Sequence, residues 1–97
     1  MHTTIYIDIS IQTSEGPQRF ARFDLGHDRD AGRRLFSNLK GSPDVDLKDM
    51  LFIELVELVN GLPINLEILT CDLQELGTNA MLITQEVFRL TNLRKRK

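Results

Sequence analysis

The first part of the chain alternates apolar and polar residues with a period of two. Every second residue from Ile5 to Ile11 is isoleucine, and polar or aromatic residues stand between them. Alternating side chains lie on opposite faces of a β-strand, so this pattern predicts a strand with one buried face. The break at 14–17 and the renewed alternation over 18–25 predict a second strand and a β-hairpin.

A helix is predicted after the hairpin, beginning near Asp28 or Asp30 and ending at about Lys40. Either aspartate can accept hydrogen bonds from the free N–H groups of the first helical turn. Gly41 suits the left-handed conformation that commonly follows a helix. The apolar residues that share one face of this helix, and that we expect in the core, are Ala31, Leu35, Phe36 and Leu39.

Residues 50–59 fit two kinds of secondary structure. Leucines spaced three or four residues apart fit a helix, whereas the alternation of Leu51, Ile53 and Leu55 fits a strand. We favour the strand because Asn60-Gly61 is a strong signal for a two-residue hairpin turn, and residues 64–69 alternate again after it. The helix remains the alternative.

Two helical segments are predicted in the last third of the chain. Asp72, with Glu75 three residues later, resembles a capping box and predicts a short helical turn that ends at 77–79. A second helix is predicted from Thr84. The residues expected to face the core from this helix are Val87, Phe88 and Leu90.

Together these elements predict a single α+β domain over residues 1–93, followed by a disordered basic tail at 94–97. The order strand, strand, helix, strand, strand, helix favours a two-layer fold, in which two helices cover one face of a four-stranded, mostly antiparallel sheet. The isoleucines of the first strand would lie under the helices. The residues then expected on the open face are Tyr6, Asp8, Ser10 and Gln12.

The composition is that of an ordinary globular protein, with 41% hydrophobic and 27% charged residues among 97. A single cysteine, Cys71, excludes an intramolecular disulfide and favours a reducing compartment, so we expect a cytoplasmic protein. The N-terminal segment lacks the pattern of a signal peptide, and no segment reaches the roughly 20 apolar residues that span a bilayer. We expect no membrane association.

Charge is unevenly distributed along the chain. Residues 44–75 carry eight acidic residues against Lys48 alone, whereas 76–97 carry Glu86 against five basic residues. A basic tail could contact phosphates, but an isoelectric point near 5.6 makes nucleic acid an unfavoured partner. The candidate phosphate contacts are Arg94, Lys95, Arg96 and Lys97.

Three segments could carry chemistry, and each has a simpler structural explanation. His27 stands beside Asp28 and Asp30, but helix capping explains the aspartates better than a metal site. The acidic segment 44–49 lacks the glycine and the distant glutamate of a calcium-binding loop. Cys71 has no base placed beside it by any local pattern. The sequence therefore predicts no catalytic residue, no metal and no cofactor.

The function that we expect is a non-enzymatic binding module that self-associates through its sheet, as a dimer, and that can bind a protein partner. Two alternatives remain open. One is a nucleic-acid accessory protein that uses the basic tail, and the other is a small enzyme whose site the fold assembles around His27, Asp28 or Cys71. The residues predicted to form the interaction surface are Tyr6, Asp8, Phe20 and Arg22.

Overall fold

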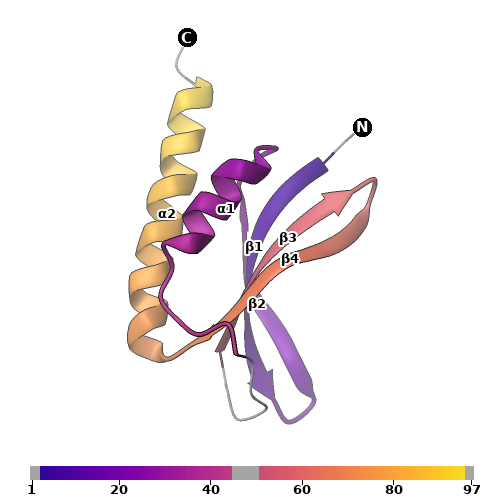
Figure 1. Cartoon of the computed structure of the whole chain (residues 1–97), viewed down its shortest axis with the longest axis vertical. Helices are drawn as coiled ribbons and strands as arrows, with labels where there is room; N and C mark the ends of the chain where they lie inside the picture. The colour runs from indigo at the N-terminus through magenta and orange to yellow at the C-terminus, as the bar shows by residue number, and fades with distance from the viewer. Residues whose placement is uncertain (1–2, 45–50, 96–97) are drawn as a thin grey trace.

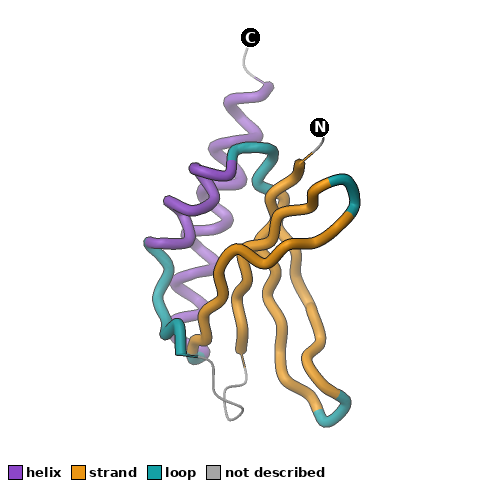
Figure 2. Tube along the Cα trace, turned by 45° about the vertical axis from the view of Figure 1, so that its right-hand side comes forward, coloured by secondary structure: helices purple, strands orange, loops and turns teal. Residues whose placement is uncertain are grey.

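A computed structural model describes residues 3–44 and 51–95. The elements follow the predicted order ββαββα, and the strands form one antiparallel sheet in the order β2-β1-β3-β4. Both helices lie on the same side of this sheet (Figures 1 and 2), so the predicted two-layer α+β fold is confirmed. The elements are β1 (Thr3–Thr13), β2 (Gly16–Asp24), α1 (Arg29–Ser37), β3 (Leu51–Val59), β4 (Leu62–Cys71) and α2 (Leu73–Lys95).

The core lies between the isoleucine face of β1 and the two helices. Ile5, Ile7 and Ile9 are almost completely buried, as predicted from their alternation, whereas Ile11 near the end of the strand is exposed and does not join the core. β1 and β3 occupy the centre of the sheet, so apolar side chains of β3 continue this face. The main partners from β3 and the helices are Ile53, Leu55, Leu35, Phe36 and Ile83, which form one buried cluster with the isoleucines.

Residues 51–59, for which the sequence allowed either a strand or a helix, form strand β3, which confirms the favoured prediction. β3 pairs with β1 on one side and β4 on the other, so both of its faces and both of its edges are used within the domain. The turn between β3 and β4 has positive φ at both central residues, 53° at Asn60 and 86° at Gly61. These angles are typical of the type I′ hairpin turn that Asn-Gly favours.

The C-terminal third differs from the prediction, because α2 is one continuous helix. The capping box does form: the Asp72 amide donates to Glu75 Oε1 at 3.0 Å, and the Glu75 amide donates to Asp72 Oδ1 at 2.7 Å. The helix then continues through 77–79 instead of stopping there, so the prediction of two separate segments was wrong. Tertiary contacts of this region outweigh the weak helix propensity of Gly77 and Asn79.

Two smaller predictions about the helices were also wrong. α1 ends at Ser37, with Asn38 as its C-terminal cap, instead of extending to about Lys40. On α2, Phe88 is 60% exposed, although Val87 and Leu90 do pack against the core as predicted. Within the described part of the chain, neither helix combines the length and apolar character needed to cross a membrane.

Residues 40–42, which we call the junction, explain why α1 ends early. The Lys40 amide donates to Asn79 Oδ1 at 2.6 Å, and Asn79 Nδ2 donates back to the Lys40 carbonyl at 2.7 Å. Ser42 exchanges two backbone hydrogen bonds with Thr70 of β4, at 2.9 and 2.8 Å. The junction is therefore held between α2 and the edge of the sheet.

Gly41 allows the junction to approach β4 closely. Its φ is 148°, and a Cβ atom at this position would lie 2.3 Å from the Thr70 carbonyl oxygen. No other residue type fits without displacing backbone, because the colliding atom belongs to the main chain. The glycine predicted to follow the first helix is thus required for a contact with the sheet.

We predict that Gly41→Ala lowers the free energy of unfolding by at least about 2 kcal/mol, because the methyl group collides with Thr70 and the φ is strained. Urea denaturation followed by circular dichroism measures this effect. Gly77→Ala is the matched control. A Cβ there meets no atom within 4 Å, so we expect this mid-helix change to stabilise by about 1 kcal/mol. Equal effects from the two changes would contradict the role of Gly41.

We predict that Asn79→Ala lowers the free energy of unfolding by about 2 to 4 kcal/mol, because both hydrogen bonds to Lys40 are lost inside the protein. Asn79 is 0% exposed. Asn38→Ala removes an exposed amide that donates to Arg34, and should cost less than about 1 kcal/mol. Thermal unfolding of both variants measures the difference. If Asn79→Ala destabilises the protein no more than Asn38→Ala, the two hydrogen bonds between Asn79 and Lys40 do not hold the junction in place.

Candidate functional site

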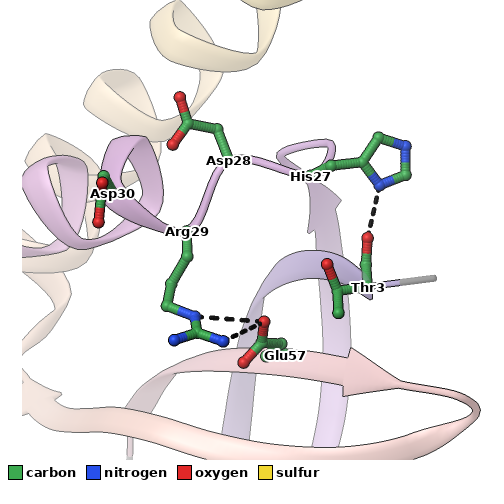
Figure 3. A pocket seen from close by; sticks show the side chains of 6 residues that line it. All are labelled: Thr3, His27, Asp28, Arg29, Asp30 and Glu57. Atoms are coloured by element: carbon green, nitrogen blue, oxygen red, sulfur yellow. Dashed lines mark hydrogen bonds and ion pairs between the residues drawn. The ribbon is translucent and has the colours of Figure 1, made fainter. Parts of the chain in front are cut away.

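Several side chains of chemically reactive or charged types surround the start of α1. They border an open depression of 770 Å³ between this helix and the adjacent ends of β1 and β3 (Figure 3). The residues that line it are Thr3, His27, Asp28, Arg29, Asp30 and Glu57.

Polar side chains of this depression bind backbone groups of the helix start and of β1. Asp28 Oδ1 accepts a hydrogen bond from the Ala31 amide at 3.1 Å, which confirms the predicted helix cap. His27 Nδ1 lies 2.5 Å from the Thr3 carbonyl oxygen, and the carboxylates of Asp28 and Asp30 point away from the imidazole (Figure 3). Among residues 3–44 and 51–95, no three His, Cys, Asp or Glu side chains are grouped so that they could hold a metal ion.

An ion pair between Arg29 and Glu57 closes the inner wall of the depression. Arg29 Nη2 and Nε donate to Glu57 Oε2 at 2.9 and 3.2 Å, and Glu57 is only 4% exposed. Sequence reasoning missed this pair. The signal was present, because Glu57 follows Ile53 and Leu55 at the same period of two and so belongs to the face under the helices.

Cys71 ends β4 and is half-buried. Burial raises the pKa of its thiol, and the carboxylates of Glu75 and Asp72 raise it further, so the thiol is protonated at neutral pH. The ionisable groups that line the nearby depression with Cys71 are the carboxylates of Asp72 and Glu75, and no histidine, lysine or arginine is among the described residues that line it. This environment is the reverse of the electropositive one that activates a nucleophilic cysteine.

The face of the sheet away from the helices carries a cluster around Asp8. Arg22 donates to both carboxylate oxygens of Asp8, at 2.7 and 2.8 Å, and its guanidinium carbon lies 4.5 Å from the centre of the Tyr6 ring. The hydrogen bond to Asp8 raises the pKa of Arg22. Arg19 approaches the same carboxylate at 3.7 Å. Three of the four residues predicted as an interaction surface therefore contact one another.

The fourth, Phe20, lies at an irregularity in β2 and is 55% exposed. The register of β1 with β2 shifts there, so that Phe20 is a bulged residue. β4, the other edge strand, has a similar bulge at Leu66, and each edge strand has a proline as its second residue, Pro17 and Pro63. Bulges and prolines oppose the addition of another strand, so both edges are protected.

The outward side of α2 bears an apolar surface that the sequence did not reveal. Leu73, Met81 and Phe88 are 78%, 55% and 60% exposed, and helical geometry places them within one arc of roughly 100°. Small or uncharged residues fill the same arc. We call this surface the α2 outer stripe; it comprises Leu73, Gly77, Ala80, Met81, Thr84 and Phe88.

The charged residues near the α2 outer stripe lie on other sides of the helix. Glu75 and Glu86 fall roughly opposite to it at 100° per residue. Arg89 donates to both carboxylate oxygens of Glu86, at 2.9 and 2.6 Å, and this contact lowers the pKa of Glu86. The α2 outer stripe is therefore uncharged, and all of its residues except the half-buried Ala80 are exposed.

Two predicted segments are only partly described. Arg94 and Lys95 belong to the last turn of α2, while Arg96 and Lys97 lie outside the described residues, so phosphate binding by the tail stays a prediction. The acidic segment 44–49 also lies outside them, except for Asp44.

Comparison with known proteins gives no match to a family model, a curated protein or a solved structure.

We predict that Arg29→Met lowers the free energy of unfolding by about 1 to 3 kcal/mol, because it leaves the buried Glu57 carboxylate without its partner. The lower end of this range allows for the solvent exposure of Arg29, which weakens its interaction with Glu57. Arg33→Met is the control, since Arg33 pairs at 3.6 Å with Glu67, whose side chain is much more exposed than that of Glu57, and this pair should contribute less than about 1 kcal/mol. Chemical denaturation at pH 7 compares the two, and a larger loss from the Arg33 variant would refute the assignment.

Proposed function

We propose that this protein is a non-enzymatic interaction module that binds a helix of another polypeptide through the α2 outer stripe. The exposure of Leu73, Met81 and Phe88 along one helical face carries the proposal. Single exposed apolar residues are common on protein surfaces, but a continuous stripe of them typically marks a binding site. We place this activity in the cytoplasm, where Cys71 would remain reduced.

The small residues of the stripe favour a helix as the bound element. Gly77, Ala80 and Thr84 lie between the three large side chains, so a second helix can approach the backbone of α2 closely there. The small residues separate Leu73 from Met81 and Met81 from Phe88, so the surface alternates large and small side chains along the helix. An amphipathic helix placed against such a surface buries apolar side chains from both partners.

The sheet is less suited to be the main interface. Its two edges are protected by bulges and prolines, and Ser42 already pairs with part of the β4 edge. The charged groups around Asp8 are largely matched within the domain. These features support a helical interface over the self-association through the sheet that we expected from the sequence.

The open sheet face is a second candidate surface because Arg22 is held in place on it. Arg22 is fixed between Asp8 and Tyr6, and Phe20 is exposed nearby on the same strand. Ordered arginine, tyrosine and phenylalanine side chains are the residue types that contribute most at protein interfaces. We propose this surface for a transient protein partner.

We predict that a photo-crosslinking amino acid at Met81 forms a discrete covalent adduct in the cell, and that Phe88→Glu in the same chain abolishes it by adding a charge to the stripe. Mass spectrometry of the adduct identifies the bound polypeptide. The same crosslinker at Phe20, an equally exposed apolar position, tests the open sheet face, and at Leu62, which is 69% exposed and belongs to neither surface, it is the control. An adduct from position 20 but none from position 81 would reject the α2 stripe and favour the open sheet face.

A further inference from the structure

We infer that the helix bound by the α2 outer stripe is α2 of a second copy of this chain, packed antiparallel about a two-fold axis. The inference rests on the proposed function, because it names the partner of the same surface. Three observations carry it: the symmetry of the stripe, the charges at the two ends of α2, and the position of α2 in the molecule.

The stripe is complementary to itself when α2 is reversed. A two-fold axis between Ala80 and Met81 brings each position of the stripe opposite another position of the stripe in the second copy. Leu73 then lies opposite Phe88, which pairs the exposed apolar side chains at the two ends. The small residues Gly77 and Thr84 oppose each other, and Met81 opposes Ala80. Large side chains therefore meet each other or a small residue, without crowding.

The charges at the ends of α2 favour the antiparallel orientation. Asp72 and Glu75 stand at its beginning, whereas the sequence after the stripe is basic beyond Arg89, which itself pairs with Glu86. A parallel pair would bring like net charges together at the ends, whereas an antiparallel pair brings the acidic beginning of one copy toward the basic end of the other and also opposes the helix dipoles. The basic residues from position 89 onward are Arg89, Arg94, Lys95, Arg96 and Lys97.

The position of α2 leaves room for a second helix. Figure 1 shows α2 at the outer side of the helical layer, and Figures 1 and 2 both show its C-terminal end extending beyond α1 and the sheet. The exposure of Leu73 and Phe88 shows that neither end of the stripe is covered within the described chain. Two copies joined here would keep both open sheet faces accessible, so the Tyr6–Arg22 surface remains available in the dimer.

The contact is small, so the dimer is expected to be weak. The stripe extends over 16 residues, which is about 24 Å of helix, and a single pair of helices buries less area than a standard stable interface. We therefore expect a dissociation constant on the order of 10 to 100 μM. Its salt dependence should be modest, because the stripe itself is uncharged.

Sedimentation equilibrium of the full chain tests the dimer. We expect a monomer–dimer equilibrium for the unaltered chain, at least a tenfold weaker dimer for Met81→Glu, and a change below about twofold for Leu62→Glu, the control at a 69% exposed apolar position outside both proposed surfaces. Phe20→Glu is measured beside them to test the open sheet face. Thr84→Arg is a second interface variant, and circular dichroism establishes that each variant is folded. A chain that stays monomeric up to about 1 mM, or a dimer weakened by Phe20→Glu alone, overturns the inference.

Cysteine crosslinking tests the orientation in a Cys71→Ser background. Gln74 and Gln85 are exposed on the same flank of the stripe. In the antiparallel dimer, Gln74 of one copy and Gln85 of the other differ by only about 3 Å along the axis, whereas the two Gln74 residues are about 20 Å apart. A short bismaleimide should therefore join a Gln74→Cys chain to a Gln85→Cys chain, and join two Gln74→Cys chains poorly. Efficient joining of two Gln74→Cys chains indicates a parallel pair and overturns the inference.

The crosslinking and sedimentation results together distinguish an error in the proposed function from an error in this inference. If the photo-crosslinked adduct at position 81 contains a different protein and the isolated chain is monomeric, the inference is wrong and the interaction module stands. If position 81 forms no adduct and the chain is monomeric, both are wrong.

Discussion

The domain depends on the way its first helix is joined to its second half, at the junction of residues 40–42. The side-chain amide of Asn79 both accepts from and donates to the backbone of Lys40, while Ser42 pairs with Thr70. One short segment thereby fixes α2 to the end of α1 and α1 to the edge of β4. Because Asn79 is fully buried, breaking this contact would leave polar backbone groups unsatisfied inside the protein.

The strands could be predicted because their local signals agree with their final environment. Ile5, Ile7 and Ile9 alternate cleanly because β1 has one face under the helices, and Asn60-Gly61 fixes the turn that joins β3 to β4. The ambiguity of 51–59 has a physical source: β3 is central and has buried residues on both faces, such as Leu55 and Val56, so its alternation is weak.

The features that sequence reasoning missed all depend on residues that are distant in the chain. Gly77 and Asn79 are weak helix formers, and only the contact of Asn79 with Lys40, 39 positions earlier, explains why α2 passes through them. The partner of Glu57 likewise lies 28 positions away, at Arg29. The outer stripe escaped notice because a helix assumed to begin at Thr84 excludes Leu73 and Met81, so their alignment with Phe88 could not be seen.

Because α2 is one continuous helix, it offers a surface for association other than the edges of the sheet. Edge strands are the usual route by which a small sheet pairs with another copy, and here each edge strand carries a proline and a bulge close to its hairpin end. Leu73, Met81 and Phe88 lie instead on one face of a helix, whose backbone hydrogen bonds are satisfied internally. Contact through that helix would bury side chains without opening the sheet to uncontrolled strand addition, so the proposed interface is compatible with the protected edges.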